Sequence, residues 1–242
     1  MDPTRQAFLD ELYAHGREHD ERLDDRLERF RNVEPETAEL LGVLVRSMAA
    51  QRVLEIGTSN GYSTIWLGDA AEAVRGTVLS LEIDAERTAE ARDNLEQAGV
   101  DAVIELRTQD AGEALSAFAS GAFDLVFLDA ERRHYVGYWP DLLRVLRDGG
   151  LLVVDNCLSH AKELVDFSEL VYGTEGVTST LLTVGAGAPS WSRSIRSRRR
   201  TKPRSPRSRS RGWRRSRASR RRSPARAPWS SSAPCSRPSN CH

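Results

Sequence analysis

Cysteine is scarce in this chain, long apolar runs are absent, and acids are missing from its C-terminal end. The 242 residues contain three cysteines, too few and too badly spaced for a disulfide framework or a cysteine zinc site. No run reaches about eighteen apolar residues, the length that a membrane-spanning helix needs. The first residues also lack the basic region and apolar core of a signal peptide. These absences predict a cytoplasmic protein with no membrane partner.

The missing acids divide the chain into two parts of opposite charge. Residues 189–242 contain seventeen Arg and one Lys but no Asp or Glu, although the formal net charge of the whole chain is zero. The same residues include fifteen Ser and seven Pro and almost no aliphatic side chains, so they cannot bury enough apolar surface to offset the entropy of ordering. We predict a disordered tail over 189–242, which would bind nucleic acid only non-specifically, through its charge.

The residues before this tail have the pattern of one α/β domain. Residues 1–50 predict a helical segment that packs on the core, with helices over 4–15, over 20–30 and from Pro35. In the core, residues 51–188, short apolar runs alternate with helical segments, which is typical of a mostly parallel sheet with helices on both faces. The predicted strands are 52–56, 77–82, 102–107, 123–129 and 151–155, and the predicted helices are 61–71, 84–98, 110–119, 136–147 and 159–171.

The stretch from Val53 to Ser63 has the pattern of a buried strand that ends in a glycine turn and opens a helix. Gly57 and Gly61 permit the positive φ angles and the close backbone approach that a ligand at the end of a strand requires. Glu55 stands inside the apolar run, where a carboxylate needs either backbone donors or a cationic ligand group. The pattern predicts a nucleotide-type cofactor site.

Polar residues follow all five predicted strands, at the edge where open parallel sheets bind ligands. Glu82 comes twenty-five residues after Gly57, the position of an acid that accepts hydrogen bonds from ribose hydroxyls in related folds. The alternative for Glu82 is an exposed acid at a helix entrance. Asp110 either accepts from an adenine amino group or caps the helix that follows it.

Asp129, Asp155 and Asn156 follow two of these strands and form a second group. Three oxygen ligands with room for water or substrate oxygens suit a hard divalent cation, Mg²⁺ or Ca²⁺. The structural alternative is that Asp129 caps a turn while the other two residues open a loop. Four histidines show no ligand spacing with this group and are predicted on the surface or in loops: His15, His19, His134 and His160.

Three motifs resemble those of the cation-dependent S-adenosylmethionine O-methyltransferases, the family that contains catechol and caffeoyl-coenzyme A O-methyltransferases. They are Leu-Glu-Ile-Gly-Thr-Ser-Asn-Gly-Tyr-Ser at 54–63, Leu-Asp-Ala-Glu-Arg-Arg-His-Tyr at 128–135 and Val-Val-Asp-Asn at 153–156. The resemblance covers roughly residues 33–188. It implies a Rossmann-like methyltransferase fold, S-adenosylmethionine as cofactor, and a divalent cation, in the first place Mg²⁺ with Ca²⁺ or Mn²⁺ as alternatives. It also implies a homodimer.

The resemblance further implies a role for each site residue. The residues implied to bind the cofactor are Glu55, Gly57, Ser59 and Ser63 on its methionine side, Glu82 at the ribose, Asp110 and Ala111 beside the adenine, and Asp129. The residues implied to bind the cation are Asp129, Asp155 and Asn156. The cation would lower the pKa of a hydroxyl on a small phenolic or catechol-like substrate, whose oxygen then takes the methyl group.

One departure from the family lies in the catalytic pair that the motifs suggest, Asp129 and Arg132. Where the family often has a lysine that can act as a general base, this chain has Arg132, whose guanidinium does not deprotonate in proteins. Arg132 can therefore attract a phenolate but should not take its proton.

A second departure follows the segment 177–184, where the family continues into a final antiparallel strand. Back-translation of 188–195 with G/C-rich codons, read from the third base, gives Ala-Leu-Leu-Val-Ala-Ile. We therefore predict that the tail is a frame-shift product, that the final strand is missing or degraded, and that activity is impaired. The alternative functions are a nucleic-acid-binding protein that uses the tail, and an inactive S-adenosylmethionine binder.

Overall fold

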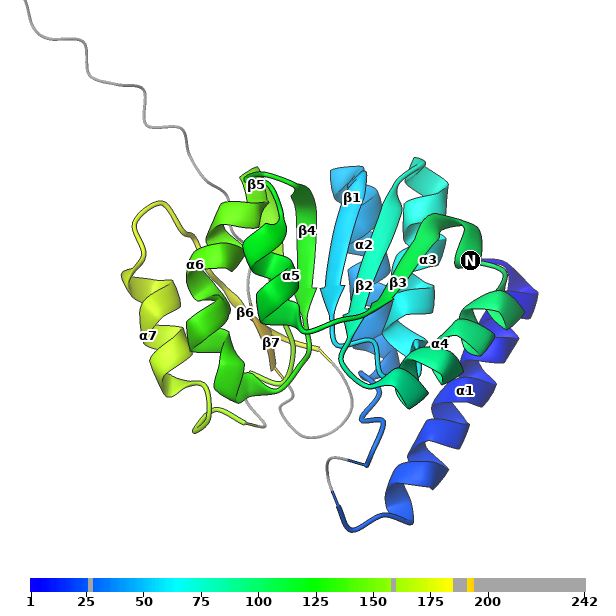
Figure 1. The fold of residues 1–242 in the computed structure, drawn as a ribbon. Helices are drawn as coiled ribbons and strands as arrows, with labels where there is room; N and C mark the ends of the chain where they lie inside the picture. The colour runs from blue at the N-terminus through cyan, green and yellow to red at the C-terminus, as the bar shows by residue number, and fades with distance from the viewer. Residues whose placement is uncertain (26–27, 158–159, 185–190, 194–242) are drawn as a thin grey trace, which may run out of the picture. The chain divides into compact units, whose positions relative to one another are not determined.

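The computed structural model describes residues 1–25, 28–157, 160–184 and 191–193. The chain divides into two units, Met1–Thr201 and Lys202–His242, and the second lies outside the described residues. In the first unit, seven strands form one sheet in the order β3-β2-β1-β4-β5-β7-β6 (Figure 1). The five parallel strands are β1 (Arg52–Ile56), β2 (Thr77–Glu82), β3 (Ile104–Thr108), β4 (Phe123–Leu128) and β5 (Leu146–Val154).

The helices alternate with these strands along the chain. They are α1 (Pro3–Glu21), α2 (Pro35–Met48), α3 (Tyr62–Val74), α4 (Ala85–Ala98), α5 (Ala111–Ala117), α6 (Tyr135–Val145) and α7 (Val165–Gly173), with short 3₁₀ turns η1 (Asp101–Val103) and η2 (Arg132–His134). The predicted mostly parallel sheet with helices on both faces is confirmed. The strand order reverses between β1 and β4, and parallel sheets of this kind bind ligands at such a point.

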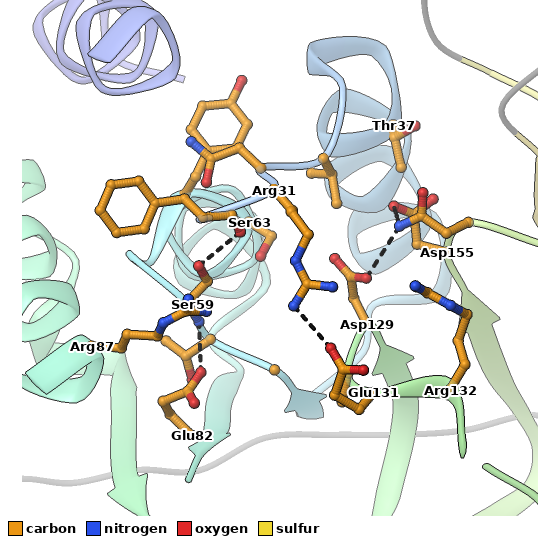
Figure 2. Close-up of a pocket in the computed structure, with 18 of the residues that line it drawn as sticks. Arg31, Thr37, Ser59, Ser63, Glu82, Arg87, Asp129, Glu131, Arg132 and Asp155 are labelled. Atoms are coloured by element: carbon orange, nitrogen blue, oxygen red, sulfur yellow. Dashed lines mark hydrogen bonds and ion pairs between the residues drawn. The ribbon is translucent and has the colours of Figure 1, made fainter. Parts of the chain in front are cut away.

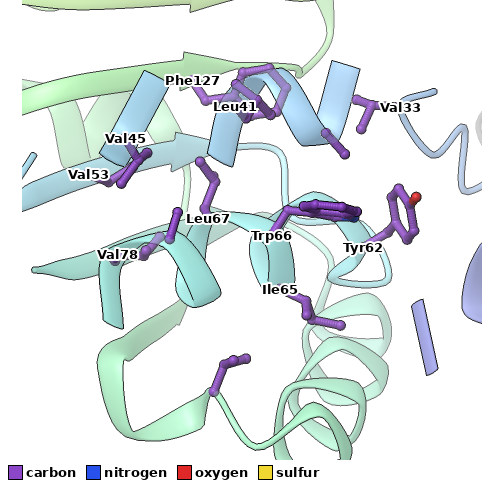
Figure 3. Close-up of a cluster of buried hydrophobic side chains, with 14 of the residues drawn as sticks. Val33, Leu41, Val45, Val53, Tyr62, Ile65, Trp66, Leu67, Val78 and Phe127 are labelled. Atoms are coloured by element: carbon purple, nitrogen blue, oxygen red, sulfur yellow. The ribbon is translucent and has the colours of Figure 1, made fainter. Parts of the chain in front are cut away.

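Two hydrophobic clusters hold the helices against opposite faces of the sheet. Val53 belongs to a cluster that includes side chains of α1, α2, α3 and α4 (Figure 3), whereas the next residue, Leu54, belongs to a cluster with side chains of α5, α6 and α7. Successive residues of a strand point to opposite faces, so apolar residues in unbroken runs are needed to bury both. Leu9 and Leu12 attach α1 to the first cluster.

The N-terminal segment differs from its prediction. A single helix, α1, runs from Pro3 to Glu21, and the predicted helix over 20–30 is wrong for the residues described there. The reason is a contact between residues 10 and 11 positions apart: the carboxylate of Asp20 accepts hydrogen bonds from the backbone N–H groups of Phe30 (2.7 Å) and Arg31 (2.8 Å). These bonds turn the chain back toward the end of α1 instead of letting a second helix propagate. Arg31 has a left-handed φ of 55° at this point.

Smaller differences occur at the ends of other elements. The predicted strand over 102–107 begins at Ile104, because Asp101–Val103 forms a 3₁₀ turn. The predicted strand over 151–155 begins earlier, at Leu146, and its pairing with β4 shifts register between Phe123 and Leu125.

Two short strands complete the sheet at the β5 edge, β6 (Leu181–Thr183) and β7 (Trp191–Arg193). β7 lies between β5 and β6 and pairs antiparallel with both; among the described residues, its pairing with β5 places Val154 opposite Arg193. The final antiparallel strand, predicted as missing or degraded, is present over the three described residues of β7, and the rest of the predicted disordered tail lies outside the described residues. No helix in the described part of the chain is both long and apolar enough to cross a membrane.

Candidate functional site

A cavity of about 660 Å³ opens beyond the carboxyl ends of β1, β2, β4 and β5 (Figure 2). One part of its wall consists of residues at the ends of these strands, and a second part comes from residues 30–34 and Thr37 at the start of α2. The helices α3 and α4 and the turn at His160 contribute the remaining residues. The cavity therefore lies at the reversal of strand order, where the sequence predicted a cofactor site.

The glycine turn after β1 brings the first and fourth strands together. Gly57 has a φ of +101°, and a Cβ placed on it would stand 2.1 Å from the backbone oxygen of Asp129. Gly61, with a φ of +88°, caps the N-terminus of α3. Both glycines adopt the left-handed conformations that the sequence predicted, and Gly57 is needed because no side chain fits between β1 and the residue after β4.

Glu55 is fully buried in β1 and its carboxylate accepts three hydrogen bonds from hydroxyl groups. The donors are Ser63 Oγ (2.6 Å), Thr64 Oγ1 (2.5 Å) and Ser80 Oγ (2.6 Å). Burial raises the pKa of Glu55 to about 7, while these three hydroxyls oppose the rise. Side-chain hydroxyls, and not the backbone donors that the sequence predicted, pair with Glu55 in the described residues. The other predicted partner, a cationic ligand group, stays a prediction.

Glu55 is also not among the residues that line the cavity, although Ser63 is. Glu55 therefore acts on the cavity wall indirectly, by fixing the hydroxyl of Ser63. Ser59, the other serine predicted at the cofactor, lines the cavity and donates its Oγ–H to the backbone oxygen of Phe30 (2.9 Å). That hydrogen bond connects the glycine turn to the N-terminal part of the wall.

Glu82, at the end of β2, lines the cavity and is held in place by three backbone N–H groups. Its Oε2 accepts from Ser59 (2.9 Å), and its Oε1 accepts from Ile83 (3.0 Å) and Asp84 (3.1 Å). A carboxylate fixed in this way keeps further acceptor positions, since its two oxygens offer about four. The alternative of an exposed acid is wrong, because Glu82 is 8% exposed.

Asp110 and Ala111 do not line the cavity in the described residues. Asp110 is the N-cap of α5 and accepts the backbone N–H of Glu113 (2.9 Å). The capping alternative raised from the sequence is therefore observed, and the structure leaves these two residues outside the group that it brings together.

Asp129, Asp155 and Asn156 do converge at the cavity. Backbone hydrogen bonds explain the convergence, because Asp129 N–H donates to the oxygen of Ile56 and Asp155 N–H donates to that of Leu128, which extends the ladder of the sheet by one residue each. Asn156 Nδ2 donates to Asp155 Oδ2 (3.1 Å) and to Asp129 Oδ1 (3.4 Å).

The two carboxyl groups share a poorly solvated site. Burial raises the pKa of Asp155, and the negative charge of Asp129 raises it further. Burial also raises the pKa of Asp129, although the positive charges of Arg31 and Arg132 oppose the change. Two carboxylates placed this close are costly in the ionised state unless a positive charge joins them.

The donor set fits a hard cation in kind. Two carboxylates and one amide oxygen are the ligand types that Mg²⁺ and Ca²⁺ prefer, and the cavity leaves space for further oxygens. Within the described residues, no group of three or more His, Cys, Asp or Glu is arranged to hold a metal, so the site would depend on Asn156 and on oxygens from outside the chain.

Arg132 lies in η2, three residues after Asp129, and its side chain is 3% exposed. Its Nε donates to Glu163 Oε2 (2.9 Å), while its Nη2 is buried and has no hydrogen-bond partner. Arg31 stands on the other side of Asp129, and its Nη2 donates to Glu131 Oε1 (3.0 Å) (Figure 2). The structure thus places two guanidinium groups beside the carboxylates.

Sequence reasoning missed several residues that line the cavity. These are Phe30, Arg31, Glu34, Thr37, Tyr62, Arg87 and His160. His160 lies in a turn, as predicted, and this turn contributes to the cavity wall. For Arg31 no signal was available, since it directly follows the charged stretch 20–30 that was predicted to be helical.

A model of the O-methyltransferase family matches residues 17–170 of the chain. Catechol O-methyltransferase of Mycobacterium tuberculosis is 40% identical over 126 residues, which are 52% of this chain and 57% of that protein. The chain therefore spans little more than half of this curated relative.

Solved structures match a larger share of this chain than the curated relative does. A putative O-methyltransferase from Klebsiella pneumoniae has 31% identity and a TM-score of 0.67, and the match covers 81% of this chain and 91% of that one. The O-methyltransferase from Bacillus cereus in complex with SAH has 27% identity and a TM-score of 0.67, over 78% of this chain and 90% of that one.

Proposed function

Because the chain belongs to the O-methyltransferase family, we propose that it transfers a methyl group from S-adenosylmethionine to a hydroxyl of a small phenolic or catechol-like substrate. One observation carries the proposal: a glycine turn with Glu82 and an oxygen group made of Asp129, Asp155 and Asn156 meet in the same cavity. The first set suits a nucleoside-containing cofactor and the second a hard cation beside it.

S-adenosylmethionine, when bound, supplies a methyl group on a positively charged sulfur. Ser59 and Ser63 are our candidates for the methionine side, because both line the cavity next to the glycine turn. Glu82 is our candidate for the ribose, since its carboxylate is fixed by three N–H groups and keeps acceptor positions for hydroxyls. A pre-fixed carboxylate loses little conformational freedom when the ligand binds.

A divalent cation, in the first place Mg²⁺, lowers the pKa of the substrate hydroxyl when bound. Asp129, Asp155 and Asn156 would hold it and thereby fix the position of the hydroxyl relative to the methyl group. Arg132 stabilises the ionised oxygen through its charge but does not take the proton. Water or a carboxylate of the cavity accepts the proton instead. One C–S bond breaks and one C–O bond forms.

The proposal is tested by calorimetry and by a methyl-transfer assay with catechol, each with and without Mg²⁺. We expect S-adenosylmethionine to bind the chain and Glu82→Gln to weaken that binding about tenfold, the loss of one good hydrogen bond. We expect Asp155→Asn to abolish methyl transfer while cofactor affinity stays within a few-fold. Asp93→Asn, at an exposed position of α4, is the matched control and should behave as wild type.

The outcomes separate the competing functions. Methyl transfer that is equally fast with Mg²⁺ and with a chelator would contradict the role of the cation. Cofactor binding without transfer to any phenol would favour the inactive binder. Homodimer formation and non-specific binding of nucleic acid by the tail stay predictions from the sequence.

A further inference from the structure

Arg132 has a guanidinium that the chain itself uses only in part. Its Nε donates to Glu163, but its Nη2 has no partner, and the whole side chain is 3% exposed. A guanidinium stays charged in proteins, so this is a buried charged donor without an acceptor. Such donors are rare in folded chains because they are costly, and an unsatisfied one in a cavity wall calls for an explanation.

The neighbouring carboxylates do not supply that acceptor. Within the described residues, no ion pair joins Arg132 to Asp129 or to Asp155, although the positive charge of Arg132 does act on both. If these two carboxylates hold a cation, their oxygens are directed to it and remain unavailable to the arginine. Arg132 is then left facing a cavity that can bring an acceptor from outside.

Arg31 repeats the arrangement on the opposite side of Asp129. Its Nη2 donates to Glu131 (3.0 Å), while its Nε is buried and has no partner. The bonds from Asp20 to the backbone of Phe30 and Arg31 hold this side chain against the cavity. Two guanidinium groups with unused donors therefore flank the same carboxylate (Figure 2).

The charge of Arg132 also favours an anion beside it. A divalent cation would neutralise Asp129 and Asp155, whereas the other acids of the wall, Glu34, Glu82 and Asp84, keep their charge. The glutamate that pairs with Arg132 lies nearer to water than Arg132 does, because the side chain of Glu163 is 47% exposed and that of Arg132 is 3% exposed. Water screens exposed charges more than buried ones, so the charge of Arg132 is only partly cancelled by its partner. Arg31 and Glu131 are similarly exposed, at 32% and 28%, and Arg31 contributes chiefly its unused donor.

We propose that Arg132, together with Arg31 across Asp129, forms an anion-binding subsite, and that the substrate carries a carboxylate on the same small molecule as the hydroxyl that is methylated. The inference rests on the proposed function and names its substrate class. A carboxylate suits the site because a guanidinium binds it through parallel N–H groups in one plane. The desolvation of Nη2 is already incurred in the folded chain, so an anionic acceptor gains a strong charge-assisted hydrogen bond.

The test uses two probes that differ by one group, 3,4-dihydroxybenzoate and catechol. Calorimetry measures the binding of each to the full chain loaded with S-adenosylhomocysteine, which prevents turnover, in Mg²⁺ and again in a chelator. We expect the carboxylate probe to bind at least about tenfold more tightly than catechol, as one charge-assisted hydrogen bond would give. We expect Arg132→Met to reduce this ratio to near one, because the affinity for the carboxylate probe should fall further than the affinity for catechol.

Arg133→Met is the matched control, because Arg133 is the next residue, is exposed, and does not line the cavity. It should keep the full preference. Should Arg132→Met fail to fold, judged by circular dichroism, Arg132→Lys decides the matter: it keeps the charge but loses the planar fork, and we expect the preference to fall at least threefold.

The results distinguish this inference from the proposed function. Equal affinity for the two probes, or a preference that survives both substitutions, overturns the subsite even if both probes are methylated. A preference that disappears in Arg132→Met supports the subsite even if neither probe is methylated, in which case the proposed reaction fails alone.

Discussion

Gly57 and the backbone oxygen of Asp129 are in such close contact that a Cβ on Gly57 would stand 2.1 Å away. We predict that Gly57→Ala lowers the free energy of unfolding by on the order of 3 kcal/mol or more, because the left-handed φ and the clash both add cost. The same change should move Asp129 away from Asp155 and Asn156 and reduce the thermal shift that Mg²⁺ produces. Urea unfolding and a thermal shift with Mg²⁺ measure the two effects.

Gly99→Ala is the control for the first prediction. Gly99 also has a positive φ, +64°, but nothing lies within 4 Å of a Cβ there. It should cost about 1 to 2 kcal/mol from the backbone alone and leave the Mg²⁺ response intact. If the two variants were equally stable, the contact with Asp129 would have no energetic weight.

Glu55 provides a prediction on pH. Its folded pKa of about 7 lies above the ordinary value of 4.5, so the folded chain holds the proton more tightly than the unfolded chain. The stability from this group is therefore complete below about pH 4.5 and is lost as the pH rises through 7, by on the order of 3 kcal/mol. In Glu55→Gln we expect the free energy of unfolding to decline less steeply with rising pH than in wild type. Urea unfolding at several pH values, in a chelator, measures this.

Asp124 offers the opposite case. Burial alone would raise its pKa, but the backbone N–H of Arg52 and the guanidinium of Arg147 outweigh it and lower the pKa. The stability that Asp124 gives is present above its unfolded pKa and is lost as the pH falls through the folded value. Asp124→Asn should therefore destabilise the chain at pH 7 and make little difference in acid, and a loss confined to acid would contradict this assignment.

The third group of predictions concerns the carboxylate of Asp20, which binds the backbone of Phe30 and Arg31. Asp20→Ala removes both acceptors, so we expect amide hydrogen exchange at these two residues to accelerate at least about tenfold, the loss of roughly 1.4 kcal/mol of local stability. Cofactor affinity should fall as well, because Ser59 Oγ donates to the backbone oxygen of Phe30.

Glu21→Ala tests whether that effect is specific. Glu21 is the next residue and pairs only with Arg17 among the ion pairs of the described residues, with its side chain 70% exposed. Exposed pairs of this kind contribute little, so exchange at residues 30 and 31 should stay as in wild type. Faster exchange in both variants would assign the effect to α1 as a whole.

The final prediction concerns β7, which has one register pair with β5 among the residues that the structure describes. We propose that the chain from 189 onward is read in a shifted frame, and that Ala-Leu-Leu-Val-Ala-Ile belongs in this strand. A version with that sequence restored should unfold at higher urea concentration and aggregate less, because apolar strand residues would cover the edge of β5. An intact reading frame through codon 188 in independent isolates would rule the proposal out.

Features that depend on local sequence could be predicted, and features that depend on long-range contacts could not. The parallel core was predictable, because unbroken apolar runs such as that around Leu54 and glycines such as Gly57 are needed locally. The convergence of Asp129, Asp155 and Asn156 was predictable too, since the ends of neighbouring parallel strands meet at one edge.

The remaining features depend on contacts between residues far apart in the chain. Arg31 reaches the cavity only because Asp20 binds its backbone, and a charged stretch with helical composition gives no hint of that bond. The hydroxyl partners of Glu55 come from α3 and β2, so they could be identified only once the pairing of the strands was known. His160 likewise joins the wall through the fold, without any ligand spacing in the sequence.

The hydroxyl groups around Glu55 have an evolutionary consequence. Thr64 and Ser80 do not line the cavity, so in the described residues their hydroxyls serve the buried carboxylate and not a ligand. A lineage that replaced Glu55 with an apolar residue would leave the hydroxyl of Thr64 buried without this acceptor, and selection would then favour an apolar residue at 64. Ser80 would keep a partner in Thr58 Oγ1, 2.6 Å away. Positions 55 and 64 should consequently change together among homologues, while Ser63, which lines the cavity, should remain serine.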